Sequence, residues 1–250
     1  FSIPQIMLPP LMKNHGNYIV SLGSVCKWLG EIAEGLGVEI YPGFSAAEVL
    51  FNSDNSVKGV ATGDMGVSRE GGAKDSWEAG MELHAKFTLF SEGTRGSLSK
   101  FLIDNFNLSD GKDFQKYAIG LKEVWEIQEE NFSEGLVEHS MGWPLSDGTN
   151  GGSFLYHFDN NLVSIGYVIH LNYTNPYASP FDEFQQFKTH PSVKKILKGG
   201  KRLSYGARAI TTGGYQSVPK LNFPGGALIG CSAGFLNYPK IKGTHNAMES

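Results

Sequence analysis

The feature that most constrains this chain is a long stretch of alternating apolar and polar side chains between Tyr117 and Tyr173. A period of two is typical of strands that bury one face. The alternation falls into four runs, at residues 117–127, 137–145, 151–158 and 162–173. The turn Asp159-Asn160-Asn161 between the last two runs is a hairpin signal. We therefore expect an antiparallel sheet in the middle of the chain.

Apolar residues at helical spacing predict two amphipathic helices. The first runs from Leu22 to Leu36 and ends at Gly37. The second runs from Pro180 to His190 and is stopped by Pro191, with three phenylalanines on one face that we assign to the core. These are Phe181, Phe184 and Phe187. Further strands are expected at 38–41, 48–51, 57–61 and 201–210.

Two glycine-rich turns each follow a short apolar strand. The strand 85–90 leads into Ser91-Glu92-Gly93-Thr94-Arg95-Gly96 and then a helix from about Ser97, an order that dinucleotide sites use. The strand 227–229 leads into the turn 230–234, and another helix is expected near Asn246. Unpaired N–H groups at such turns and helix starts favour an anionic ligand. Each turn could equally be a plain connection that binds nothing.

Composition and motifs exclude several kinds of function. The net charge is -4 and the lysines are scattered, so we set nucleic acid aside. The two cysteines, Cys26 and Cys231, cannot form a disulfide framework or hold a four-thiolate cluster. No nucleophile elbow, zinc-protease motif or Walker loop occurs, and the seven histidines are scattered. What remains favours a redox cofactor, which brings its own chemistry.

Residues 1–12 combine large apolar side chains with three prolines, which predicts an irregular hydrophobic loop. Two interpretations stay open, a core-facing or frayed terminus and a surface that contacts lipid or an apolar ligand. The apolar residues are Phe1, Ile3, Ile6, Met7, Leu8 and Leu11. There is no apolar run long enough to span a bilayer. Because the chain begins at Phe1 and a helix is cut at Ser250, we expect a piece of a longer protein.

Several segments together resemble the electron transfer flavoprotein-ubiquinone oxidoreductase family. They are TNGGSFLYH (149–157), NPYASPFDEFQQFKTHPS (175–192), GGKRLSYGARA (199–209), GGYQSVPKL (213–221) and FPGGALIGCSAGFLNYPKIKGTH (223–245). NHGNYIV (14–20) and FSEGTRG (90–96) are similar to the same family. The likeness covers nearly the whole chain.

The resemblance implies an α+β or α/β protein in which part of a glutathione-reductase-like FAD domain accompanies an antiparallel-sheet ubiquinone-binding domain. It assigns residues 1–84 to a mixed part with a membrane-facing loop, an amphipathic helix and FAD-domain strands, and residues 85–110 to a strand-turn-helix of the FAD domain. Residues 111–205 would form the ubiquinone-binding domain, and residues 206–250 would return to the FAD domain. The family's G-x-G-x-x-G fingerprint and the four cysteines of its [4Fe–4S] cluster are absent from this sequence.

The resemblance also implies roles for individual residues. Those at the flavin and its pyrophosphate are Gly230, Ser232, Ala233, Gly234, Thr244 and Gln216, with Glu92, Gly93 and Arg95 on the adenosine side. Gly151 and Gly152 match a glycine pair whose backbone faces a ubiquinone carbonyl. The apolar loop 1–12 matches the segment that dips into the bilayer, which favours membrane contact for its six large side chains.

The activity implied is electron transfer from reduced electron transfer flavoprotein to ubiquinone through FAD, by an enzyme bound to one face of a membrane. That membrane would be the bacterial inner membrane or the matrix side of the mitochondrial inner membrane. We expect this chain alone not to complete the transfer. Two alternatives remain, a geranylgeranyl-reductase-like flavin-dependent reductase and a non-catalytic lipid-binding fragment.

Overall fold

The computed structural model describes residues 3–10, 13, 15–146, 148–237 and 242–250. These residues form two compact units. The first, which we call the sheet unit, contains residues 3–26 and 115–212 of the described chain. The second, the turn unit, contains residues 27–114, 213–237 and 242–250. The turn unit is therefore built from segments that precede and follow the main part of the sheet unit.

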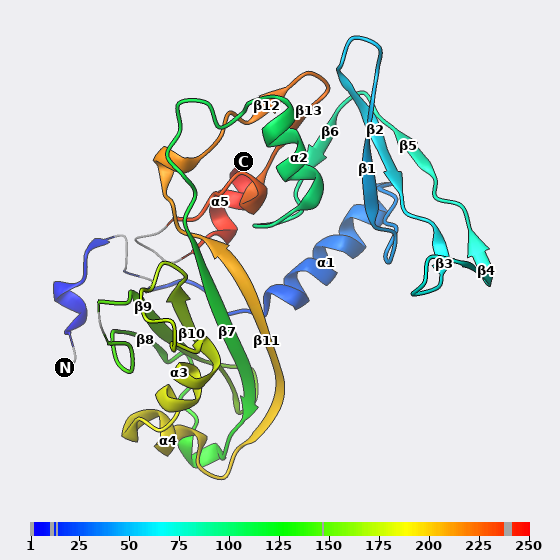
Figure 1. Cartoon of the computed structure of the whole chain (residues 1–250). Coiled ribbons are helices and arrows are strands. Elements are labelled where there is room, and N and C mark those ends of the chain that lie inside the picture. The colour runs from blue at the N-terminus through cyan, green and yellow to red at the C-terminus, as the bar shows by residue number, and fades with distance from the viewer. Residues whose placement is uncertain (1–2, 11–12, 14, 147, 238–241) are drawn as a thin grey trace. The chain divides into compact units, whose positions relative to one another are not determined.

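The sheet unit contains a five-stranded antiparallel sheet with the order β11-β7-β10-β9-β8 (Figure 1). Its strands are β7 (Tyr117–Glu126), β8 (Val137–Met141), β9 (Gly151–Phe158), β10 (Leu162–His170) and β11 (Lys201–Thr211). The four strands predicted from alternation and the strand predicted at 201–210 are confirmed. The β9–β10 turn has Asp159 and Asn161 at positive φ, which short polar residues tolerate best among non-glycines.

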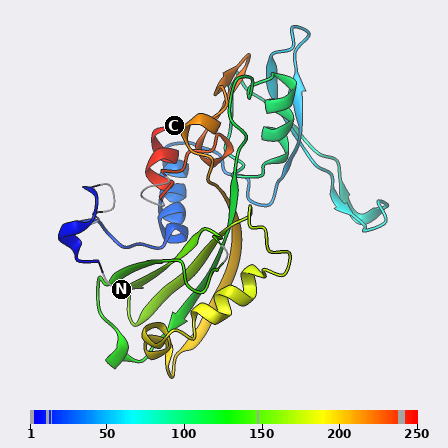
Figure 2. The ribbon, with the colours of Figure 1, turned by 60° about the vertical axis from the view of Figure 1, so that its left-hand side comes forward.

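Two helices cover one face of this sheet (Figure 2). They are α3 (Pro180–Phe187) and α4 (Pro191–Leu197). Alternate residues of β10, from Val163 to Ile169, point to the helices and join Phe184 and Phe187 in a buried core. The Ser179 hydroxyl accepts the Asp182 N–H and begins α3, with Pro180 in the first turn where no hydrogen bond is lost. A short 3-10 helix, η3 (Glu129–Asn131), follows β7.

Three predictions in these segments were wrong. Pro191 does not end the helical region but opens α4, because proline fits the first turn of a helix as well as it stops one. Phe181 is 58% exposed, whereas Phe184 is 2% exposed, because the short α3 turns only part of its aromatic face to the core. No strand forms at 38–41, where the described backbone is irregular.

The turn unit contains three small sheets and a second core. The sheet orders are β1-β2-β5, β12-β13-β6 and β3-β4. The strands are β1 (Ala46–Phe51), β2 (Val57–Thr62), β3 (Met65–Val67), β4 (Ala73–Glu78), β5 (Glu82–His84), β6 (Thr88–Phe90), β12 (Asn222–Phe223) and β13 (Gly226–Leu228). The helices are α2 (Ser97–Asn105), α5 (Thr244–Glu249) and the 3-10 turns η4 (Tyr215–Ser217) and η5 (Gly230–Ser232). Phe90, Leu102 and Leu228 lie in the core that joins them.

The predicted helix after residue 22 is present as α1 (Leu22–Gly35). None of its residues is buried, so its apolar stripe, which includes Trp28 and Ile32, is exposed. The 3-10 helix η1 (Gln5–Met7) lies before it in the sequence. Within the described residues, no helix combines the length and the apolar composition that a bilayer crossing requires. The fold mixes helices with antiparallel sheets, which agrees with the predicted α+β class.

Candidate functional site

Two parallel strands of the turn unit bring the glycine turns together. β6 and β13 pair in parallel, with Thr88 opposite Gly226 and Phe90 opposite Leu228. The Ile229 N–H continues the ladder by donating to the Phe90 carbonyl over 3.1 Å. Parallel strands end at the same edge of a sheet, so the turns 91–96 and 230–234 lie next to each other at that edge.

A direct hydrogen bond joins the two turns. The Gly93 N–H donates to the Ser232 hydroxyl oxygen over 3.1 Å, although the residues are 139 positions apart. Gly93, Gly230 and Gly234 all have positive φ, at 85°, 56° and 83°, where other side chains are strained. A Cβ atom on Gly93 would meet no described atom within 4 Å. The site therefore combines bare backbone with open space.

Helix α5 packs beside the second turn. A Cβ on Gly230 would lie 3.4 Å from that of Ala247, and the Gly230 N–H donates to the Ser250 hydroxyl over 2.9 Å. Thr244 is the first residue of α5. Ala233 is buried. Among the described residues, the amides of Cys231 and Ser232 have no acceptor, and burial raises the pKa of the Cys231 thiol. The predicted flavin residues of these two segments thus lie together around free N–H groups.

Three other predicted residues have different surroundings. The Glu92 carboxylate accepts hydrogen bonds from the Ser99 N–H and hydroxyl, each over 2.6 Å, and from the Leu98 N–H over 3.3 Å, so it holds the N-terminus of α2. Arg95 is exposed. Gln216 lies in η4, where its carbonyl accepts the Asp113 N–H over 3.0 Å.

In the sheet unit, the glycine pair opens strand β9. Gly151 lies opposite Ile169, and Gly152 lies between Val168 of β10 and Met141 of β8. A Cβ on Gly152 would lie 2.4 Å from the Ser140 carbonyl oxygen, and one on Gly151 would lie 2.4 Å from that of Val168. Both positions therefore have no room for a side chain without a shift of the backbone.

The turn after β8 covers the helix side of this pair. The Tyr167 hydroxyl donates to the carbonyls of Gly142 and Trp143, over 2.7 and 3.1 Å. Burial raises the pKa of Tyr167 to about 12, so the hydroxyl keeps its proton and remains a donor. Leu145 of the same turn lies against Gly151. The turn is held down over the start of β9.

The opposite face of β9 carries aromatic side chains. Phe154 and Tyr156 lie two and four residues beyond Gly152, on the same face, with ring centroids 5.1 Å apart. The Tyr156 hydroxyl lies 3.1 Å from a ring nitrogen of His139 on β8. These rings are only partly buried. Together with Gly152 they offer a flat, largely apolar surface to a planar ligand.

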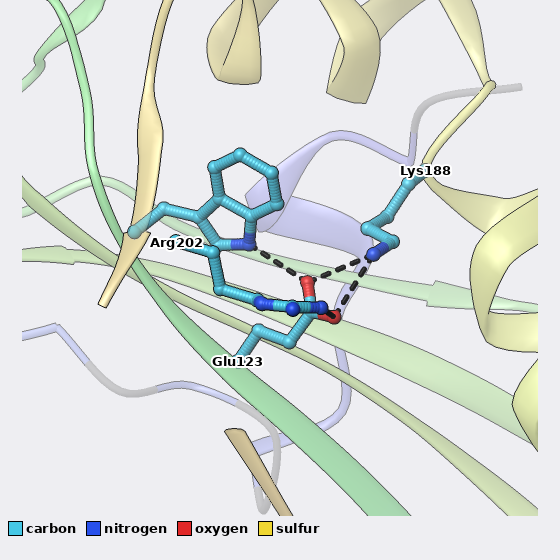
Figure 3. A network of polar contacts seen from close by, with 4 residues as sticks. Glu123, Lys188 and Arg202 are labelled. Carbon is cyan, nitrogen blue, oxygen red and sulfur yellow. Dashed lines mark hydrogen bonds and ion pairs between the residues drawn. The ribbon is translucent and has the colours of Figure 1, made fainter. Parts of the chain in front are cut away.

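Sequence reasoning missed a buried charge network under the helices (Figure 3). Glu123 of β7 is 3% exposed, and both its oxygens lie 2.9 Å from the Lys188 ammonium nitrogen. Arg202 Nη1 and Trp125 Nε1 donate to the same carboxylate, over 3.3 and 2.8 Å. The signal available was a glutamate on the apolar face of a predicted strand. Its partners lie 65 and 79 residues away, which spacing alone does not reveal.

The apolar residues near the N-terminus lie on the surface. Ile3, Ile6 and Met7 are exposed, Ile6 to 87%, and Leu8 is half-buried. Phe1 and Leu11, which were predicted to share this role, lie outside the described residues. The described residues contain no group of three or more His, Cys, Asp or Glu side chains that could hold a metal ion.

Solved structures with a similar fold include a reductase-like protein and a flavin-dependent brominase. A geranylgeranyl bacteriochlorophyll reductase-like protein from Thermoplasma acidophilum matches 90% of this chain and 50% of its own, with a TM-score of 0.67 and 16% identity. The flavin-dependent brominase Bmp2 matches 92% of this chain and 53% of its own, with a TM-score of 0.58 and 16% identity. This chain thus shares its fold with these two proteins.

Sequence comparison identifies relatives that are much more similar to this chain. Residues 117–210 match the family model described as ETF-QO, ubiquinone-binding. The chain is 57% identical over its whole length to the mitochondrial electron transfer flavoprotein-ubiquinone oxidoreductase of Homo sapiens, and 56% identical over 99% of its length to that of Pseudomonas aeruginosa. It covers 41% and 45% of those proteins. The chain is thus similar over its whole length to electron transfer flavoprotein-ubiquinone oxidoreductases, and it spans less than half the length of these relatives.

Proposed function

We propose that the complete protein transfers electrons from reduced electron transfer flavoprotein to ubiquinone through FAD. The observation that carries this proposal is the identity of 56–57% to relatives named for that reaction, which extends over the whole chain and so includes both glycine sites. We assign the turn unit to a glutathione-reductase-like FAD domain and the sheet unit to the ubiquinone-binding domain. A likeness at 16% identity supports only the fold, so a geranylgeranyl-reductase-like activity has weaker support.

The residues of the two adjoining turns fit a flavin cofactor. Gly93, Gly230 and Gly234 leave backbone bare, and the free amides of Cys231 and Ser232 are donors for pyrophosphate or flavin oxygens. Thr244 at the start of α5 is a further candidate contact, and Ala233 supports the turn from the core. When bound, FAD supplies the electron-carrying ring, while these residues position it and set its electrostatic surroundings.

We do not propose that Glu92, Arg95 and Gln216 contact the cofactor at the two adjoining turns themselves. Glu92 accepts hydrogen bonds from the first amides of α2. It thereby fixes the turn that carries Gly93. Arg95 and Gln216 remain candidate contacts to the cofactor's outer parts. Arg95 lies on an exposed turn and Gln216 lies in the 3-10 turn η4.

Gly151 and Gly152 are proposed to bind the ubiquinone headgroup. A quinone offers two carbonyl acceptors, for which the backbone N–H groups at the start of β9 are candidate donors. The aromatic face of Phe154 and Tyr156 beyond Gly152 suits a flat ring. Leu145 limits the space on the helix side of Gly151.

We further propose that the complete protein lies on one face of a membrane, bacterial or mitochondrial, through the exposed residues near the N-terminus. Burying Ile3, Ile6 and Met7 in the interface would contribute about 1.5–3 kcal/mol each. Electron transfer flavoprotein would be its electron donor, and the proposed [4Fe–4S] cluster would belong to a part of the protein outside this chain.

The decisive assay uses the complete protein with reduced electron transfer flavoprotein and a short-chain ubiquinone. We expect quinone reduction that requires bound FAD. If the protein binds FAD but instead reduces prenyl double bonds and not quinone, the reductase alternative replaces this one. If it binds neither FAD nor quinone yet associates with vesicles, the lipid-binding alternative holds.

The membrane contact is tested separately by vesicle flotation. Replacing Ile3, Ile6 and Met7 by serine should release the complete protein from phosphatidylcholine vesicles, whereas replacing the exposed Leu36, Val38 and Met65 should not. Equal flotation of both triple variants would contradict a role for the N-terminal residues, and quinone reduction in detergent tells whether either variant has lost its fold.

A further inference from the structure

A groove on the sheet unit carries four lysines and is not part of either glycine site. It has a volume of about 810 Å³ and lies between the end of β7 and the helices α3 and α4. Trp125, Pro191 and Leu197 form apolar parts of its wall. The cationic residues that line it are Lys188, Lys194, Lys195 and Lys198. No acidic residue lines it.

One of the four lysines is already neutralised. The Lys188 ammonium lies 2.9 Å from both oxygens of Glu123, and Arg202 shares that carboxylate (Figure 3). The single negative charge of Glu123 is therefore divided between two cations. The Trp125 N–H also donates to Glu123, which fixes the indole ring at the groove. Nothing in this network is left to neutralise the lysines of α4.

The other three lysines have no acidic partner among the described residues. Lys194, Lys195 and Lys198 are within 4.0 Å of no described carboxylate. Glu129 and Glu130 of the nearby η3 are exposed and form no ion pair with them. Lys194 and Lys195 lie in the last turn of α4, and Lys198 follows directly after it, so three like charges gather at this end of the helix and repel one another. The C-terminal end of the helix dipole attracts them and offsets part of this repulsion.

We propose that this groove binds a phosphate-bearing ligand. A phosphate carries up to two negative charges and several acceptor oxygens, so it can engage three ammonium groups at once. Lysine binds phosphate as a point charge, whereas arginine would be the better match for a planar carboxylate, and no arginine lines the groove. The apolar wall of Trp125, Pro191 and Leu197 suits the organic part that the phosphate carries.

Binding of inorganic pyrophosphate to the full chain, measured by calorimetry at about 150 mM salt, tests the proposal. The variant K194Q/K195Q/K198Q should bind pyrophosphate at least about tenfold more weakly. The matched control K74Q/K100Q/K112Q removes the same charge from exposed lysines elsewhere and should bind as the unchanged chain does. Equal melting temperatures establish that both variants are folded.

A second arm distinguishes a lipid headgroup from a free phosphate compound. Vesicles of phosphatidylcholine with and without phosphatidic acid are compared in flotation. A loss of the phosphatidic acid effect in the groove variant alone identifies a lipid source, and a loss of pyrophosphate binding without it identifies a soluble one. Equal weakening by both triple variants, or no saturable binding of either probe, would overturn the proposal.

Discussion

The sheet unit and the turn unit both place glycine at a proposed ligand site, but for opposite physical reasons. At Gly152 the backbone has ordinary φ and there is no space, because the Ser140 carbonyl lies 2.4 Å from where a Cβ would be. At Gly93 there is space, but φ is +85°. The strand site therefore depends on close packing of backbones, and the turn site depends on backbone conformation. The two sites should respond differently to the same substitution.

The two units also differ in how exposed their ion pairs are. Glu123 of the sheet unit is buried with Lys188, which is 14% exposed. Glu82 of the turn unit lies on the surface, 3.9 Å from Lys58. Buried ion pairs are costly to break because one charge is left without a partner, whereas exposed pairs are screened by water. The comparison can be tested from the largest effect to the smallest.

Glu123→Gln should have the largest effect on stability. It leaves the Lys188 ammonium without a full counter-charge in a buried place, so the free energy of unfolding should fall by about 3–5 kcal/mol. Denaturant unfolding, followed by far-UV circular dichroism, measures this free energy. Glu82→Gln is the control from the other unit and should change little. Similar losses for both variants would remove the contrast between buried and exposed charge.

Gly152→Val should cost about 1–3 kcal/mol of stability, because the new side chain forces β8 and β9 apart. Gly206→Val on β11 is the matched control, since a Cβ there meets nothing within 4 Å. Hydrogen exchange of the β8 and β9 amides reports whether pairing is lost. If β8–β9 pairing survives while the Michaelis constant for quinone rises, the glycine is needed for the ligand and not for packing.

Gly93→Ala should cost about 1–2 kcal/mol, because a positive φ strains any side chain even in open space. The strain can be relieved by moving the turn, which would break its hydrogen bond to Ser232. We expect FAD to dissociate more readily from the complete protein, with quinone affinity unchanged. Retained FAD would show that the turn tolerates a side chain. The only remaining difference between the two positions would then be the lack of room at Gly152.

The smallest effect is a pH dependence that belongs to the sheet unit. Burial lowers the pKa of His157 and of His170, so the folded protein binds their protons less readily than the unfolded chain does. Stability is therefore complete above the ordinary histidine pKa of about 6.5 and falls as the pH drops below it. His157→Asn can still accept the Ser133 N–H and should flatten the fall between neutral and acidic pH. An unchanged slope would assign the effect to His170.

Local patterns predicted the strands well and the contacts between distant segments poorly. Alternation along β7, β9 and β10 was sufficient because each strand buries one face. Pro191 was misleading because proline can stop a helix or begin one, and here α3 already ends at Phe187 while Pro191 begins α4. The partners of Glu123 could not be inferred because Lys188 and Arg202 come from other elements of the sheet unit.

In the candidate sites, too, local features were predictable and contacts between distant residues were not. The two glycine turns and the strand-turn-helix order around Ser97 were visible in the sequence, and α2 confirms the predicted helix. The capping role of Glu92 was not foreseen, because it depends on how the turn folds back onto Ser99. The groove lined by four lysines was overlooked because a count of charges along the chain does not reveal that three of these lysines lack a counter-ion among the described residues.

The parallel pairing of β6 with β13 also bears on how the protein is made. A ribosome releases β6 long before β13, and all five strands of the sheet unit emerge between them. The sheet unit can therefore close while β6 still has an unpaired edge, which is the kind of exposed strand that chaperones shield. The Gly93–Ser232 hydrogen bond can form only after β13 has emerged, so the proposed cofactor site is completed after the strands of the sheet unit.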